Sequence, residues 1–377
     1  MALLNVLCVG GHLTPYGAPR AQLSLLSDID RNIILPTVYF LRNDGALPSD
    51  LPLLFGVKAG QRARNHTPRL LADLVKLARR SDLIFSMLEG PPLYLSALAA
   101  RVTGRPMVSW VHNSWSAVLS NSSAYHRPAS RIFMPLADHT ICVSEGVQRD
   151  LLAFCPALHG RCETIPNPIP IDQIVANAAE ELPNWAIHIF EKPTVLAVGR
   201  LTWQKGFDDL IRASKLALQE GADFNLLIVG EGEDRECLAS LAQELGIADR
   251  VFLPGFVSNP YPLYKRAAML TLSSRHEGLP TVLIEALALG LPIVSLDCSF
   301  GPREILEAGR WGRLLPEADI AALGLAIVRA IRDPSWISEF RRAGSNRADF
   351  YSTRAVITRF EDALQITASA YERARLR

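Results

Sequence analysis

The stretch Ser273-Ser-Arg-His-Glu-Gly-Leu-Pro-Thr-Val-Leu-Ile-Glu-Ala-Leu-Ala-Leu-Gly-Leu-Pro-Ile-Val-Ser295 predicts a loop, a helix and a buried strand in close succession. The apolar run Ala268–Leu272 before it predicts a strand that leads into the loop. Pro280 suits the first position of a helix, where a missing N–H costs nothing. We expect the helix over Thr281–Leu289, because Gly290 and a proline two residues later are stop signals.

Two glutamates stand eight residues apart in this stretch, Glu277 in the loop and Glu285 inside the helix. Between them lie the unpaired N–H groups and the positive dipole end of a helix N-terminus, which together suit an anion such as phosphate. Taken alone, the pair has an ordinary alternative, a capped crossover helix with Glu285 on its solvent face.

The whole chain repeats this alternation of short apolar runs and helical patterns, which is typical of parallel sheets covered on both faces. Its 377 residues exceed the usual size of one core, so two domains are expected. We predict an α/β fold with an N-terminal Rossmann-like domain over 1–165 and a proline-rich linker region over 166–192. A second Rossmann-like domain follows over 193–350, and a C-terminal helix over 351–377 packs back on the first domain. Two such doubly wound domains enclose a central cleft, with ligands beyond the carboxyl ends of the strands.

The pattern predicts individual elements in both halves of the chain. The expected strands are Leu3–Val9, Ile33–Phe40, Leu83–Met87, Met107–Val111, Thr140–Val143, Val195–Val198, Asn225–Val229, Val251–Leu253, Met269–Leu272 and Pro292–Leu296. The expected helices include Ala21–Leu26, Pro68–Arg80, Gly146–Phe154, Phe207–Leu218, Arg235–Leu245 and a long stretch after Pro334.

Composition excludes several classes of protein. Hydrophobic residues make up 49% and charged residues 20% of the chain, which favours full cores over disorder. The net charge of +1 gives no reason to expect nucleic acid as a partner. Six scattered cysteines without a Cys-x-x-Cys pair argue against a zinc site and favour a reducing compartment. No apolar run approaches the ~20 residues of a spanning helix, and no secretory leader is evident, so we expect a cytoplasmic protein.

A second constellation opens the predicted second domain. A strand ends at Val198, a helix starts near Phe207, and Arg200 and Lys205 lie in the glycine-flanked loop between them. Two cations at the carboxyl end of a strand suit a diphosphate, because Arg offers a planar fork and Lys a compact charge. Asp208 and Asp209 in the first helical turn favour the helix dipole themselves, so we expect phosphate to meet Arg200 and Lys205 more than the N-terminus of this helix. For an Arg and a Lys alone, the alternative is a solvated loop.

Together, Arg200, Lys205, Glu277 and Glu285 in these strand–loop–helix contexts resemble the retaining glycosyltransferases of family 4, which have the GT-B fold. The resemblance is strongest over 194–315 and is closest to bacterial members that use UDP-sugars. It implies that Arg200 and Lys205 grip the donor diphosphate, that Glu285 holds the ribose hydroxyls, and that Glu277 lies beside the transferred sugar.

The same resemblance assigns the rest of the donor site. The turn whose backbone amides contact sugar and phosphate corresponds to Gly278, Leu279, Thr281 and Val282. The region of Phe256 corresponds to the segment that faces uracil. In the N-terminal half, Gly17 lies in a turn close to the donor phosphates, where this chain has Tyr and Pro in place of the family's Gly and Glu. His112, after a buried strand, resembles the active-site histidine near the sugar, although a lone His is more often a satisfied polar residue.

A basic segment forms a third candidate site. It contains Lys58, Arg62, Arg64, His66, Arg69, Lys76, Arg79 and Arg80, opposed by Asp73. One hypothesis is peripheral contact with an anionic membrane, to which each Lys or Arg is attracted by ~1 kcal/mol. The alternative, which we favour for the helix itself, is an ordinary crossover helix whose apolar face is buried internally. The preceding loop with Arg62 and Arg64 is then the better candidate for contact with a membrane or an acceptor.

These residues and the resemblance predict a retaining, metal-independent transferase that needs no cofactor. It would move a hexose or N-acetylhexosamine from a UDP-sugar to a glycan or lipid-linked acceptor, in surface polysaccharide or glycolipid assembly. Glu277 is a candidate nucleophile for a double displacement, whereas the family resemblance favours same-face attack with Glu277 as a positioning group. Two other functions stay open: a UDP-sugar epimerase of the same fold and a non-catalytic nucleotide-sugar-binding protein.

Overall fold

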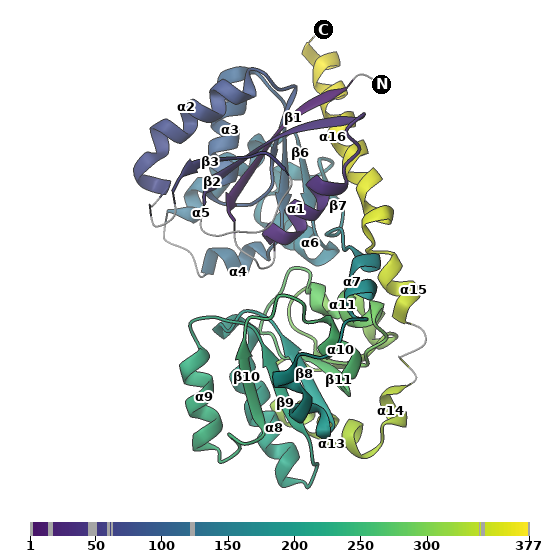
Figure 1. The fold of residues 1–377 in the computed structure, drawn as a ribbon. Coiled ribbons are helices and arrows are strands. Elements are labelled where there is room, and N and C mark those ends of the chain that lie inside the picture. Colours follow the sequence, from purple (N-terminus) through teal and green to yellow (C-terminus); the bar gives the residue numbers. More distant parts are fainter. Residues whose placement is uncertain are drawn as a thin grey trace. The chain divides into compact units, whose positions relative to one another are not determined.

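The computed structural model describes residues 3–13, 18–43, 51–58, 61, 63–120, 125–338, 340 and 344–375 (Figure 1). The chain divides into two compact units, one formed by Met1–Ile169 with Thr353–Arg377 and the other by Pro170–Ser352. The predicted linker 166–192 is thus divided between them, and most of it is folded: it forms α7 (Ile171–Asn177) and the 3₁₀ helix η4 (Asn184–Glu191) of the second unit.

The first unit is built on a parallel sheet, which has seven strands within the described residues, in the order β3-β2-β1-β4-β5-β6-β7. Continuous apolar runs form its central strands, which are buried on both faces. The strands are β1 Leu4–His12, β2 Ile34–Arg42, β3 Leu53–Val57, β4 Leu83–Ser86, β5 Met107–Val111, β6 His139–Cys142 and β7 Cys162–Thr164. The helices are α1 Ala18–Asp28, α2 Thr67–Ala78, α3 Pro91–Thr103, α4 Trp115–Ser120, α5 His126–Phe133, α6 Glu145–Phe154 and α16 Thr353–Arg375, with 3₁₀ turns at Ala63–His66, Met134–Leu136 and Pro156–Leu158.

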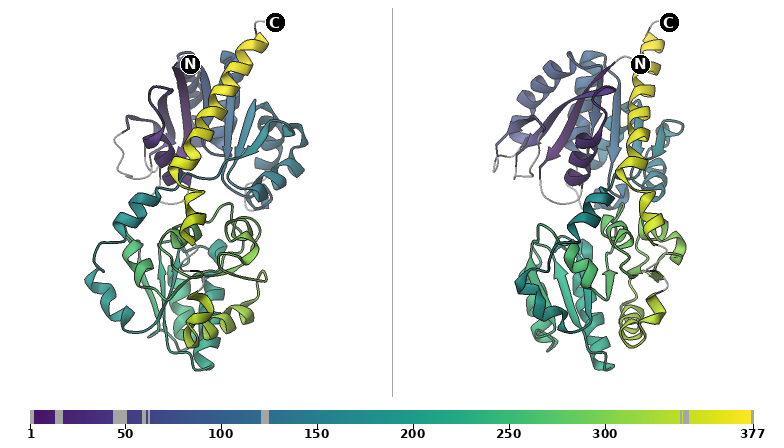
Figure 2. Two further views of the ribbon diagram at one scale, coloured as in Figure 1. Left: turned by 90° about the vertical axis from the view of Figure 1, so that its right-hand side faces the viewer. Right: turned by 45° about the vertical axis from the view of Figure 1, so that its right-hand side comes forward.

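The C-terminal helix α16 lies along the sheet of the first unit, as both views of Figure 2 show. Its buried Phe360 packs edge-on against Trp110 of β5, with ring centroids 4.7 Å apart, and also against Phe85 of β4. Glu361 accepts a hydrogen bond of 2.7 Å from the backbone N–H of Asp30. The last helix of the chain therefore completes the core of the first unit.

The second unit contains a parallel sheet of six strands among the described residues, in the order β10-β9-β8-β11-β12-β13. The strands are β8 Thr194–Val198, β9 Asn225–Val229, β10 Val251–Gly255, β11 Met269–Leu272, β12 Ile293–Leu296 and β13 Arg313–Leu315. Besides α7 and η4, the helices are α8 Phe207–Gln219, α9 Arg235–Glu244, α10 Tyr261–Arg266, α11 Thr281–Ala288, α12 Pro302–Ile305, α13 Ile320–Arg332, α14 Ser335–Ser338 and α15 Gly344–Asp349, with 3₁₀ turns at Trp203–Lys205 and Glu307–Gly309.

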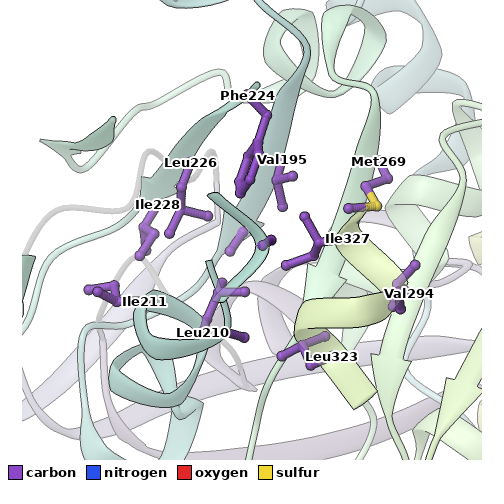
Figure 3. Packing of buried hydrophobic residues seen from close by; sticks show 14 of the residues in the cluster. Val195, Leu210, Ile211, Phe224, Leu226, Ile228, Met269, Val294, Leu323 and Ile327 are labelled. Carbon is purple, nitrogen blue, oxygen red and sulfur yellow. The ribbon is translucent and has the colours of Figure 1, made fainter. Parts of the chain in front are cut away.

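The core of the second unit lies between this sheet and helices α8 and α13 (Figure 3). Leu210 and Ile211 of α8, together with Leu323 and Ile327 of α13, are fully buried against the strands. Apolar residues at helical spacing form this contact, and their burial stabilises the unit by about 25 cal/mol for each Å² of apolar surface removed from water. The core fixes α8, and with it the loop that carries Arg200 and Lys205.

The structure confirms the α/β architecture and each of the expected strands, whose ends shift by at most three residues. The unpredicted strands β3, β7 and β13 lie at sheet edges and are only partly buried, so they carry no long apolar run. The expectation that Pro280 is the first residue of the helix was wrong by one residue. Pro280 has an extended backbone and is the N-cap residue of α11, which begins at Thr281. None of the described helices is long and apolar enough to cross a membrane.

Candidate active site

The candidate site of the second unit lies where the strand order of its sheet reverses. Strand β8 has β9 on one side and β11 on the other, so chain segments leave its carboxyl end in opposite directions. Such a switch point leaves a crevice beyond the strand ends, where open α/β sheets bind ligands. The loop 199–206 follows β8 and the loop 273–280 follows β11, so the two predicted constellations meet at this point.

Lys205 and Glu277 are in direct contact there. The Lys205 ammonium donates to Glu277 Oε1 over 2.7 Å, and the two side chains are 20% and 7% exposed. The Ser274 hydroxyl donates to the same Oε1 over 2.6 Å. Glu277 is therefore a buried carboxylate in direct contact with a cation, and both groups are close enough to act on one ligand.

Glycines allow the loop backbones to touch. Gly206 has φ +60°, and a Cβ atom there would lie 2.2 Å from the carbonyl oxygen of Ser273. Gly230, after β9, has φ +149°, and its Cβ would lie 1.8 Å from the carbonyl oxygen of Gly199. Any side chain at these positions would push the loops apart, so the glycines fix the close approach of Lys205 to Glu277.

Arg200 is placed on the same edge but faces a different carboxylate. Its guanidinium donates to Glu233 Oε2 over 3.1 Å, from the loop that follows β9, and both side chains are 60% exposed. The structure therefore brings Lys205 to Glu277 and leaves Arg200 in an exposed pair, which has a small energetic value of its own.

Glu285 lies in the second turn of α11 and is half-buried, not on the solvent face. The hydroxyl of the fully buried Tyr264 in α10 donates to Glu285 Oε2 over 2.9 Å. Around it, the predicted donor-turn residues lie at the start of α11: Gly278 and Leu279 are buried, and Thr281 and Val282 are half-buried. Tyr264 was not predicted from the sequence, because a tyrosine in an apolar helix is usually a core residue.

Phe256 follows β10 and is 48% exposed. It borders an apolar pocket of about 390 Å³ on the edge of the sheet, with Trp185 and His188 of η4 and Phe252 of β10 among its lining. An exposed aromatic ring at a strand's carboxyl end is compatible with a ring-stacking contact.

His112 belongs to the first unit, directly after β5. It is buried, its Nε2–H donates to the carbonyl oxygen of Met87 over 3.1 Å, and its Nδ1 has no hydrogen-bond partner among the described residues. Burial lowers the pKa of His112 to about 3, so the ring is neutral near pH 7. A neutral ring with an acceptor nitrogen can receive a hydrogen bond from a hydroxyl.

Glu89 was missed in the sequence, although it lies next to His112. This buried carboxylate accepts the backbone N–H of His112 over 3.1 Å and the side-chain amide of Asn113. Burial raises its pKa. A glutamate two residues after a buried strand was the available signal, and it orients the loop that carries His112.

Two predictions fall on parts of the chain outside the described residues: Gly17 in the first unit and Arg62 in the basic segment. The neighbouring helix α2 buries Leu70, Leu74 and Ala78, so its apolar face is used in the core of the first unit. Among the residues that the structure describes, no three His, Cys, Asp or Glu side chains gather as a metal site.

The site of the second unit thus defines a class of protein: a two-unit α/β protein with a buried acid–cation pair at a switch point. Family models cover both halves. Residues 35–173 match Glycosyltransferase Family 4, and residues 186–349 match Glycosyl transferases group 1. The chain is thus similar to family-4 type glycosyltransferases over a segment in each half, and its fold is GT-B.

Known relatives and structures are consistent with this family. The chain is 32% identical over 185 residues to lipopolysaccharide 1,6-galactosyltransferase of Salmonella typhimurium, covering 47% of this chain and 48% of the relative. It is 29% identical over 315 residues to N-acetylgalactosamine-N,N'-diacetylbacillosaminyl-diphospho-undecaprenol 4-alpha-N-acetylgalactosaminyltransferase of Campylobacter jejuni, covering 80% and 78%. The first relatives that it matches are covered over 44%, 54% and 48% of their own length, so the chain spans about half of them. The structure of Anabaena HepE with UDP and glucose has the same fold, with a TM-score of 0.79, 18% identity and coverage of 96% of this chain and 99% of HepE.

Proposed function

We propose that this protein is a retaining glycosyltransferase. It transfers a hexose or N-acetylhexosamine from a UDP-sugar to a glycan or lipid-linked acceptor. The observation that carries the proposal is the buried contact of 2.7 Å between Lys205 and Glu277 at the switch point of the second sheet. The two matching family models, and the relatives named for transfer to lipopolysaccharide and to a diphospho-undecaprenol saccharide, support polysaccharide or glycolipid assembly as the setting.

Charge stabilisation of the leaving diphosphate is the proposed source of catalysis. Lys205 and Arg200 receive the diphosphate, and because both lie in one short loop, their charges are oriented before the donor arrives. On arrival the diphosphate replaces Glu233 as the partner of Arg200 and shares Lys205 with Glu277. These cations take the part that a divalent metal plays elsewhere, so we propose that no metal is required.

Bond changes occur at the anomeric carbon of the donor sugar. The bond from that carbon to the diphosphate oxygen breaks, and its electron pair leaves with the UDP. The acceptor hydroxyl oxygen forms the new bond, and its proton passes to the departing diphosphate oxygen on the same face. We propose attack on the same face, with Glu277 positioning the sugar. Glu285, held by Tyr264, anchors the ribose hydroxyls, and Phe256 faces the base.

Peripheral contact with an anionic membrane from the cytoplasmic side would bring a lipid-linked acceptor to the enzyme. The basic stretch of Arg62 and Arg64 is the proposed contact surface, because the apolar face of the helix α2 that follows it in sequence is already used in the core of the first unit. Flotation with anionic liposomes, comparing the native chain with a variant in which Arg62 and Arg64 are changed to Glu, tests this part alone.

The decisive experiment is a donor screen followed by a transfer assay. A thermal-shift screen over UDP-, GDP- and ADP-sugars identifies the donor, because a ligand at 100 Kd adds ~2.7 kcal/mol of stability. Label from the stabilising donor should then appear in an acceptor pool of glycans and polyprenyl-diphosphate saccharides, with the anomeric configuration retained by NMR and the rate unchanged by EDTA. Label that stays on UDP in a changed sugar indicates an epimerase. Tight binding without transfer or hydrolysis indicates a nucleotide-sugar-binding protein.

A further inference from the structure

Arg275 has more polar contacts than any role proposed so far requires. It lies in the loop after β11, two residues before Glu277, and its side chain crosses to the loop and helix that follow β8. One nitrogen donates to Asp208 Oδ2 over 2.8 Å and to Asp209 Oδ2 over 2.6 Å, and the other donates to Asp208 Oδ1 over 3.0 Å. The guanidinium also donates to the carbonyl oxygen of Trp203 over 2.6 Å and lies over its ring, 5.0 Å from the centroid.

Arg275 supplies the positive charge that both carboxylates of this cluster contact. Burial alone would raise the pKa of Asp208, but the hydrogen bonds and charge of Arg275 outweigh it and lower that pKa. Burial and the charge of Asp208 raise the pKa of Asp209. Without Arg275, two carboxylates would stand without a cation in the first turn of α8, directly after the loop of Lys205, and would repel an incoming anion.

Other bonds join the same two loops. The backbone N–H of Arg275 donates to the carbonyl oxygen of Gln204 over 2.8 Å, and the Gln204 side chain donates to the carbonyl oxygen of His276 over 2.9 Å. The Ser273 hydroxyl donates to the carbonyl oxygen of Lys205 over 2.9 Å. Together these contacts fix the loop of Lys205 against the loop of Glu277 on both sides of the pair.

We propose that Arg275, Asp208 and Asp209 form a clamp that positions Lys205 and Glu277 for the donor diphosphate and shields that site from the two aspartates. Arg275 is then a positioning residue: it touches neither the sugar nor the phosphates. This inference rests on the proposed function, because it assumes that a nucleoside diphosphate occupies the crevice.

The geometry favours this role over general stabilisation of the fold. The two loops are already joined by hydrogen bonds to their backbone groups, so the ion pairs of Arg275 are not needed to hold them together. The three charged side chains lie in the two chain segments that carry Lys205 and Glu277. A small displacement of catalytic groups is costly, since misplacement by about 1 Å lowers rates by roughly a hundredfold. Loss of the clamp should therefore change catalysis more than it changes overall stability.

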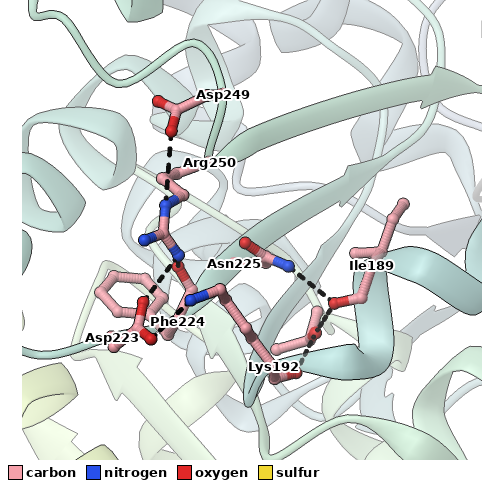
Figure 4. A network of polar contacts seen from close by, with 8 residues as sticks. Ile189, Lys192, Asp223, Phe224, Asn225, Asp249 and Arg250 are labelled. Carbon is pink, nitrogen blue, oxygen red and sulfur yellow. Dashed lines mark hydrogen bonds and ion pairs between the residues drawn. The ribbon is translucent and has the colours of Figure 1, made fainter.

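A matched control exists at the opposite end of the sheet. Arg250 precedes β10 and joins two aspartates, with 2.7 Å to Asp223 and 3.5 Å to Asp249, in a network that also includes Lys192 (Figure 4). It resembles Arg275 in charge and in the number of its carboxylate partners, but it lies at the amino ends of the strands. Arg250→Ala therefore measures what the loss of an Arg between two aspartates does away from the site.

The experiment compares Arg275→Ala, Arg275→Lys and Asp208→Asn with Arg250→Ala in the full chain. Hydrogen exchange should rise over residues 199–209 and 273–282 in the clamp variants only. Calorimetry should show UDP affinity falling on the order of tenfold in Arg275→Ala, with UMP affinity unchanged. The value of kcat should fall by roughly a hundredfold, and Arg275→Lys should restore part of it.

The outcomes separate this inference from the proposed function. If the wild type binds UDP and the clamp variants match Arg250→Ala in exchange, affinity and kcat, the clamp is overturned and the function stands. If UDP and UMP affinities fall equally, Arg275 supports the fold of the whole site and the positioning role is overturned. If the wild type binds no nucleoside diphosphate, the proposed function fails, and the clamp as a donor-site device fails with it.

Discussion

The Lys205–Glu277 pair makes a quantitative prediction about stability. The perturbations are Lys205→Met, which removes the charge and keeps the length, Glu277→Gln, which keeps the shape, and the double variant. At 2.7 Å, two unit charges attract by about 6 kcal/mol at an effective dielectric constant of ~20. Desolvation of the carboxylate offsets much of this attraction, so the net value of the pair is smaller.

Removal of one partner should be costly, because the other charge stays buried. Breaking a buried pair costs ~3–5 kcal/mol, and partial exposure of Lys205 favours the lower end for Lys205→Met. A loss of ~3 kcal/mol corresponds to a melting temperature roughly 6–12 °C lower for a domain of this size. The double variant should cost less than the sum of the single variants, with a coupling energy of ~1–3 kcal/mol.

Urea unfolding followed by tryptophan fluorescence measures these free energies, because Trp185, Trp203, Trp311 and Trp336 belong to the second unit. Arg250→Ala again serves as the control, since its pairs are more exposed and should cost about 1 kcal/mol or less. Strictly additive costs for Lys205→Met and Glu277→Gln would refute the contact between ammonium and carboxylate, and with it the basis of the proposed donor site.

Three further predictions concern single residues. Because burial lowers the pKa of His112 from 6.5 to about 3, protonation favours the unfolded chain. The stability that the neutral His112 ring contributes is complete above pH 6.5 and is lost as the pH falls towards 3. His112→Asn should therefore flatten this part of a curve of unfolding free energy against pH, measured by urea unfolding. Tyr264→Phe removes the donor to the carboxylate of α11; we expect a loss of about 1 kcal/mol in UDP binding by calorimetry, and unchanged affinity would contradict the ribose role. Gly206→Ala should lower stability for two reasons: a left-handed backbone costs a non-glycine residue about 1–2 kcal/mol, and the new Cβ would lie 2.2 Å from the Ser273 carbonyl oxygen. Gly246→Ala is the control, because its φ of +66° brings the first cost but no atom lies near its Cβ. Equal melting temperatures of the two variants would contradict the close approach of the loops.

Local patterns were sufficient to predict most of the fold. Apolar runs such as Asn225–Val229 gave the buried strands, because parallel strands covered on both faces need continuous apolar sequence. Edge strands lack that requirement, and for this reason Arg313–Leu315 was missed. The start of α11 was predicted to within one residue from Pro280, although this proline caps the helix and does not open it.

The candidate site was predicted as a set of residues but not as a set of contacts. Lys205 and Glu277 are 72 positions apart, and they meet only because β11 pairs with β8 and not with β10, which precedes it in the chain. Strand order depends on packing across the whole sheet, and no local pattern encodes it. Arg275 was missed for the same reason, since an Arg in a polar loop looks solvated until its aspartate partners are brought beside it.

Asp208 and Asp209 show why this matters for function. From the sequence, two acids in the first turn of α8 were expected to satisfy the helix dipole and to turn phosphate away from that helix. In the structure the guanidinium of Arg275 bridges both carboxylates, so half of their charge is compensated within the site. The acidic turn then has a second use. Its two carboxylates bind the guanidinium of Arg275, which lies in the same loop as Glu277, and Glu277 forms the ion pair with Lys205. Charges that would repel a diphosphate therefore help to position the cation that is proposed to bind it.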